Sequence, residues 1–172
     1  GIAFVQVPEQ LPECPVRFIR GTLVAQDGAI WAVGERASVY RLQVGDRAYE
    51  KSWLNMDDDS GFPKGKNFTC IAEDRQGRIW VGTDDSGVAV FNGREWKTYD
   101  RGNALNGEHV YALAVSPVSG EVAVATSGGV SVYDPGNDSW KALDRSTGLV
   151  EDQAASAGFD ARGNLWLAYA CG

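Results

Sequence analysis

The sequence contains little of the chemistry on which most catalytic and metal sites depend. Among 172 residues there are one histidine, His109, one methionine and three cysteines, Cys14, Cys70 and Cys171. The cysteine spacing fits no zinc site, because such a site needs pairs a few residues apart. No residue stands at the spacing from His109 that a catalytic triad or a zinc protease requires. We therefore predict no catalytic residue, no metal ion and no cofactor.

Two further absences narrow the class of protein. No apolar stretch approaches the roughly 18 residues that a membrane-spanning helix requires. We find no signal peptide, and Gly1 in place of Met suggests a trimmed N-terminus. The formal net charge is -7 and Lys and Arg form no cluster. This disfavours a nucleic-acid partner, because contact with phosphates needs basic patches.

Glycine and aromatic residues are abundant instead, and they recur in a repeat. There are 21 glycines, and aromatic residues make up 10% of the chain. A turn ending in glycine, followed by one variable residue, a hydrophobic residue and Trp, occurs at residues 27–34, 74–83 and 160–169, with a worn copy at 119–126. The turn glycines lie 49, 43 and 43 residues apart: Gly28, Gly77, Gly120 and Gly163. Repeats of this length indicate a stacked or radial array.

Each repeat is predicted to form short strands joined by tight turns. The repeats span approximately residues 16–56, 67–100, 109–144 and 153–172, the last one partial, and a strand at 3–7 is a candidate for completing a blade. The first strand of each repeat is almost continuously apolar, which indicates burial on both faces. Radial stacking of meander sheets buries both faces. We therefore predict one all-β domain over residues 1–172, a β-propeller or propeller segment of about four four-stranded antiparallel blades, the last incomplete.

Two columns of aligned residues support this interpretation. One column holds a small residue in every repeat: Ala25, Ala72, Ala114 and Gly158. Small side chains are expected where innermost strands crowd the axis and a larger one would overpack. The other column holds tryptophan in three repeats: Trp31, Trp80 and Trp166. Each indole is predicted to be a wedge between neighbouring sheets that buries about 150–250 Å².

The number of repeats leaves ring closure open. A closed four-bladed ring, a piece of a larger propeller and two chains sharing one ring are the three arrangements that fit. An open segment would expose strand edges, which favour association with another chain. Self-association is therefore one expected kind of partner. Cys70 lies in an apolar strand, where a buried thiol is favoured over a disulfide.

A polar column precedes the apolar part of each innermost strand: Arg20, Asn67, His109 and Gln153. In a propeller this column surrounds one mouth of the central channel, and converging polar groups on a concave surface are typical of ligand sites. We predict a ligand-binding site here, the alternative being solvated strand ends. No pair among Glu108, Glu151 and Asp152 is singled out for glycoside chemistry. The acidic run at residues 57–59 is interpreted as a solvated loop.

The recurring turns and strands resemble the two-component regulator propeller repeat over roughly residues 16 to 170. The match is closest at Asp74, Gly77 and residues 79–83, and it continues through residues 87–91 and Trp96. The resemblance implies a periplasmic or extracellular sensing domain, of a kind that often precedes a membrane helix and a histidine kinase. Many such sensors are linked to glycan breakdown products.

We therefore predict a non-enzymatic binding or sensing module for a small molecule such as a glycan fragment, in signal transduction. One alternative is a scaffold that binds other proteins, which would show an exposed apolar patch on its rim. The other is a propeller lyase or hydrolase, since streptogramin lyases have similar Gly-X-Ile-Trp turns.

Overall fold

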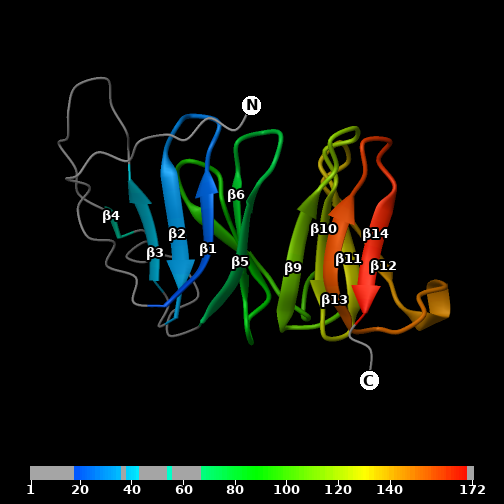
Figure 1. The fold of residues 1–172 in the computed structure, drawn as a ribbon. Helices are drawn as coiled ribbons and strands as arrows, with labels where there is room; N and C mark the ends of the chain where they lie inside the picture. Colours follow the sequence, from blue (N-terminus) through cyan, green and yellow to red (C-terminus); the bar gives the residue numbers. More distant parts are fainter. Residues whose placement is uncertain (1–17, 36–37, 43–53, 56–66, 170–172) are drawn as a thin grey trace.

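The computed structural model describes residues 18–35, 38–42, 54–55 and 67–169, which form an all-β array of antiparallel sheets (Figure 1). The first sheet contains β1 (Ile19–Val24), β2 (Ile30–Gly34), β3 (Ser38–Leu42) and β4 (Leu54–Asn55). The second contains β5 (Phe68–Glu73), β6 (Ile79–Thr83), β7 (Val88–Phe91) and β8 (Trp96–Tyr99). The third contains β9 (Val110–Val115), β10 (Val122–Thr126), β11 (Gly129–Asp134) and β12 (Ser139–Leu143). After the short 3-10 helix η1 (Arg145–Thr147), β13 (Ala154–Phe159) and β14 (Leu165–Tyr169) form the fourth.

In every sheet each strand pairs with the next strand in the chain, which is the predicted meander. The first strands of successive sheets, β1, β5, β9 and β13, are neighbours in space, so the sheets stand side by side (Figure 1). The predicted fold class is therefore confirmed, including a last sheet with only two strands among the described residues. The candidate strand at residues 3–7, Cys14, Cys171 and the acidic run at 57–59 lie outside the described residues. The sequence also predicts a fourth strand of the first repeat at residues 48–53. That range lies outside the described residues, and β4 follows directly after it.

The turn that opens each second strand explains the recurring Asp and Gly. Asp74 Oδ1 accepts hydrogen bonds from the backbone N–H groups of Gln76 and Arg78, at 2.9 and 3.0 Å. Gly77 has a φ of 75°, a conformation that a Cβ atom would strain, so the turn favours glycine. The equivalent turns also hold glycine at positive φ: Gly28, Gly120 and Gly163.

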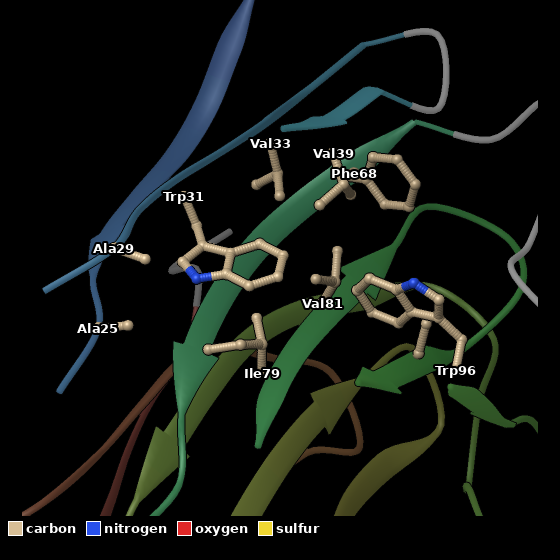
Figure 2. Packing of buried hydrophobic residues seen from close by; sticks show 10 residues of the cluster. Ala25, Ala29, Trp31, Val33, Val39, Phe68, Ile79, Val81 and Trp96 are labelled. Carbon is tan, nitrogen blue, oxygen red and sulfur yellow. The ribbon is translucent and has the colours of Figure 1, made fainter. Parts of the chain in front are cut away.

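Apolar side chains fill the space between consecutive sheets. Trp31 of the first sheet lies in one buried cluster with Ile79 and Val81 of the second (Figure 2). Trp80 of the second sheet clusters with residues of the third, and its ring centroid lies 5.3 Å from that of Tyr133. Each indole thus packs against the sheet that follows its own. Trp31 and Trp80 are 2% and 0% exposed, as predicted, and burial of that size stabilises the fold by roughly 4–6 kcal/mol per ring.

The burial predicted for Trp166 is wrong, because this side chain is 67% exposed. Trp31 and Trp80 each pack against the sheet that follows their own. The described residues contain no sheet after β14 that would cover Trp166 in the same way. The local turn is nevertheless intact: Trp166 Nε1 donates to Asp160 Oδ2 at 3.1 Å, as Trp80 Nε1 donates to Asp74 Oδ2 at 2.8 Å. The sequence repeat therefore determines the local conformation, and the neighbouring sheet determines burial.

Cys70 is a free thiol on β5, partly buried beside Gly82 of β6. Removal from water raises the pKa of this thiol, and the contact with Thr69 Oγ1, at 3.5 Å, opposes that shift only in part. The sequence predicts a buried thiol rather than a disulfide at Cys70; the thiol is free, and its burial is partial. A raised thiol pKa lowers the thiolate fraction, so Cys70 is poorly reactive at neutral pH.

Candidate functional site

The two ends of the sheet array differ in what they present. At one end the Asp-Gly turns of successive sheets meet: Arg75 Nη1 donates to Val118 O at 2.7 Å, across the second and third sheets. We call this the turn end. At the other end the innermost strands begin, and there Ser127 N donates to His109 O at 3.0 Å. We call this the strand-start end.

Three members of the predicted polar column stand at the strand-start end, directly before β5, β9 and β13: Asn67, His109 and Gln153. The alignment of Arg20 with them is wrong, because Arg20 lies within β1 and Phe18 holds the corresponding position. Glu35 N donates to Phe18 O as Asp84 N donates to Asn67 O. Arg20 and Asn67 are held within their own sheets. Arg20 forms an ion pair with Glu35 at 2.8 Å, although its side chain is 58% exposed. Asn67 Nδ2 donates to Asp84 Oδ2 at 2.8 Å. These contacts fix the two side chains near the ends of the first and second sheets.

The other two members meet at Tyr111, which the sequence reasoning missed. The His109 and Tyr111 rings lie 4.4 Å apart between centroids, and Gln153 Nε2 donates a hydrogen bond to the Tyr111 hydroxyl. Tyr111 follows His109 by two residues, so both side chains lie on one face of the extended chain. That alternation is the signal that would have found it. The third and fourth sheets are joined here by a polar cluster of three side chains.

A polar cavity of about 310 Å³ opens at the strand-start end, next to His109 in the sequence. It is lined by the linker between the second and third sheets and by the β10–β11 turn: Arg101, Asn106, Gly107, Glu108, Ser127 and Gly128. Backbone hydrogen bonds hold the linker, since Gly87 N donates to Glu108 O at 2.8 Å. The side chain of Asn106 donates to Leu143 O at 3.1 Å. The walls are therefore anchored to both sheets.

The cavity offers one cation and one carboxylate, from Arg101 and Glu108, with backbone amides and a hydroxyl between them. Such a lining suits an uncharged or zwitterionic polar ligand better than a strongly charged one. Of the carboxylates near this end, Asp152 accepts a hydrogen bond from Arg145 N through its Oδ1, at 2.8 Å. Over the described ranges, no three His, Cys, Asp or Glu side chains are grouped closely enough to hold a metal ion.

None of the helices formed by the described part of the chain has the length and apolar character needed to cross a bilayer.

The sheets and their packing define the class of protein, a β-propeller array, and the comparisons with known proteins name its repeat. The family described as "Two component regulator propeller" matches residues 61–85. The resemblance seen in the sequence is thus confirmed over these residues, which carry the two-component regulator propeller repeat. Among curated proteins, none matches the sequence.

Solved structures share the fold at low sequence identity. The extracellular domain of BT3049 from B. thetaiotaomicron, a protein named as a hybrid two-component system, aligns with a TM-score of 0.67 and 19% identity, covering 87% of this chain and 20% of that domain. The extracellular domain of BT4673 from B. thetaiotaomicron, likewise named as a hybrid two-component system, aligns with a TM-score of 0.66 and 20% identity. This alignment covers 88% of this chain and 22% of that domain. XC5397 from Xanthomonas campestris, named as a gluconolactonase, aligns with a TM-score of 0.60 and 13% identity. This alignment covers 87% of this chain and 55% of that protein. The chain spans about a fifth of the length of the first two.

Proposed function

We propose that this chain is a non-enzymatic, ligand-binding part of a sensory propeller that works in the periplasm or outside the cell. The repeat is that of two-component regulators, and similar solved structures are extracellular domains of two-component systems. The ligand is a small polar molecule, such as a glycan fragment, and binding biases signalling by a partner domain. The observation that carries the proposal is the anchored polar cavity of about 310 Å³ beside His109.

The proposed binding surface combines this cavity with the polar column around it. Cavities of about 300 Å³ and above commonly hold small ligands. Glu108 accepts hydrogen bonds from ligand hydroxyls and Arg101 donates to ligand oxygens. The cluster of His109, Tyr111 and Gln153 forms one flank of the surface, and Arg20 and Asn67 extend it along the first and second sheets. A ligand that contacts two sheets alters how those sheets pack against each other.

Calorimetric titration with a panel of neutral and acidic disaccharides tests the proposal. We expect a saturable heat with at least one probe, weakened about tenfold or more in Glu108→Gln and His109→Ala, the loss expected when one hydrogen bond to a charged or polar group disappears. Lys141→Ala, on the outermost strand β12, is the matched control and retains full affinity. Unchanged affinity in both Arg20→Ala and His109→Ala would remove the column from the site.

The exposed face of the last sheet supports a second proposal, self-association of the chain. Trp31 and Trp80 each pack on a following sheet, and Trp166 presents the same indole to solvent. We propose that this face packs against a sheet of a second copy. Light scattering on the wild type and on Trp166→Ser tests the proposal. A concentration-dependent dimer that the substitution abolishes supports it, and a monomer at every concentration refutes it.

A further inference from the structure

A cavity of about 430 Å³ lies between the first and second sheets at the turn end, opposite to the strand-start site. Its walls combine aromatic, cationic, acidic and amide side chains: Gln26, Asp27, Trp31, Arg41, Glu73 and Phe91. The first and second sheets are tied together beside it, because Gln26 N donates to Glu73 Oε2 at 2.8 Å. The cavity is thus a gap in an otherwise closed interface, and the next interface shows what normally fills such a gap.

Between the second and third sheets, the equivalent space holds Arg78. Its Nε donates to Asp74 Oδ2 at 2.6 Å, its Nη1 donates to the Tyr133 hydroxyl at 3.1 Å, and its guanidinium carbon lies 5.6 Å from the Trp80 ring centroid. Counted from the tryptophan of the turn, the residue that corresponds to Arg78 is Ala29. A long side chain is therefore missing from the first interface, and the cavity results.

The positive charge is replaced from another strand. Arg41, which pairs with Trp31 across β2 and β3, forms an ion pair with Asp27 at 2.8 Å, and its guanidinium carbon lies 5.7 Å from the Trp31 ring centroid. These distances are close to those of Arg78. What the first interface lacks is therefore not a cation.

What the first interface lacks is an acceptor oxygen for Trp31 Nε1. Trp80 Nε1 donates to Asp74 Oδ2 at 2.8 Å, but Trp31 Nε1 is buried and has no hydrogen-bond partner among the described residues. Figure 2 shows this nitrogen on the side of the ring that faces Ala25, a residue of the cavity wall. Phe91 occupies the place of Tyr133, because Phe91 pairs with Ile79 as Tyr133 pairs with Val122, so a hydroxyl is also absent. A buried donor without a partner is costly. Arg78 Nη2 and Trp140 Nε1 share this condition, but of the three residues Trp31 is the one that lines this cavity.

The lining defines the chemistry of a molecule that completes the interface. Such a molecule supplies an acceptor oxygen to Trp31 Nε1 and to Arg41. It also donates a hydrogen bond to the carboxylate of Asp27 or Glu73 and presents an apolar face to Phe91. The two carboxylates repel an anion, and a cation competes with Arg41 for the carboxylate of Asp27. Hydroxyl groups both donate and accept. We propose that this cavity, which we call the inter-sheet site, binds a neutral ring bearing several hydroxyl groups, of the size and chemistry of a hexose.

The inter-sheet site is independent of the strand-start cavity, because it lies at the opposite end of the sheets and shares no residue with it. A ligand there contacts the first and second sheets together and stiffens their packing. The site stands whether or not the strand-start cavity binds a ligand of its own.

Nitrogen-15 NMR titration with the methyl glycosides of glucose, galactose and mannose tests the inter-sheet site. The indole N–H signal of Trp31, assigned by its loss in Trp31→Phe, is expected to shift in a saturable way with at least one glycoside. The double variant Ala29→Arg with Arg41→Val reproduces the residues of the second interface, Arg78 and Val90, and fills the cavity. It is expected to abolish the shift while the Trp166 indole signal and the thermal midpoint remain unchanged.

Glu73→Gln is the second variant, in case the filled variant does not fold, and it is expected to weaken binding about tenfold. His109→Ala is the matched control at the strand-start end, and it retains the Trp31 response even if the proposed function fails. The absence of a saturable shift with all three glycosides overturns the proposal. So does an equal shift in the filled variant, or tighter binding of glucuronate or glucosamine than of the neutral glycosides.

Discussion

Replacing Asp74 by alanine would test how strongly one turn residue couples a sheet to its neighbour. The side chain is 1% exposed. It accepts hydrogen bonds from Gln76 N, from Arg78 N and Nε, and from Trp80 Nε1, at 2.9, 3.0, 2.6 and 2.8 Å. The substitution removes all four at once and leaves Arg78, whose side chain is 19% exposed, without its carboxylate.

The expected loss is large because two of the donors are held away from water. Removing one partner of a buried ion pair costs about 3–5 kcal/mol, and an unsatisfied buried donor such as Trp80 Nε1 costs about 1–3 kcal/mol. These penalties overlap, since both arise from one carboxylate, so we expect about 4 kcal/mol. For a chain of this size that corresponds to a fall of roughly 8–16 °C in the thermal midpoint. It is also a considerable part of the 5–15 kcal/mol that holds a typical domain together.

Urea unfolding followed by tryptophan fluorescence and by circular dichroism provides the measurement. Asp160→Ala is the matched control, because Asp160 accepts the same kinds of hydrogen bond in a turn that no following sheet covers in the described part of the chain. We expect a clearly smaller loss there. Equal losses in the two variants, or a loss below about 1 kcal/mol for Asp74→Ala, would contradict the reasoning, because burial would then contribute nothing.

Three further predictions concern other parts of the array. Trp166→Phe should remove more of the acrylamide-quenchable fluorescence than Trp80→Phe does, because Trp166 is exposed and Trp80 is buried. The opposite order would contradict the inference that an indole is buried only where a following sheet covers it. Hydrogen bonds, first from the Asn164 side chain and then from Trp166, lower the pKa of Asp160 to about 2. This carboxylate therefore stabilises the fold above its ordinary pKa and loses that effect as the pH falls from about 4 toward 2. Asp160→Asn should flatten the pH dependence of urea unfolding in that window, and an unchanged slope would refute the assignment. Gly82→Ala should cost about 1–3 kcal/mol in the same unfolding assay, because a Cβ atom would lie 2.6 Å from Cys70 Sγ; no loss would show that this contact relaxes freely.

Local patterns in the sequence predicted most of the array. The Asp-Gly turn specifies its own hydrogen bonds, which form within a few residues, so Asp74 and Asp160 make similar turns although only one is buried. The apolar first strands predicted neighbours on both faces, and β5 and β9 have them. These inferences succeeded because they depend on backbone geometry and on periodicity, both of which are encoded locally.

The candidate sites depend on partners far away in the chain, and the sequence predicted them only in part. The polar column located His109 and Gln153 at the same end, but only the packing of β9 beside β13 joined them through Tyr111. The inter-sheet site has no local signature at all. It arises because Ala29 stands where a neighbouring repeat has Arg78, and the consequence of that difference appears only where two sheets face each other.

The sequence by itself determined the repeat, the strands and the turn chemistry of this protein, since each arises from interactions within one hairpin. Only the tertiary structure decided which tryptophans are buried, which polar groups meet and where cavities remain. Burial requires a second surface, and whether a second surface lies over Trp31, Trp80 or Trp166 is a property of sheet neighbours rather than of the residues themselves.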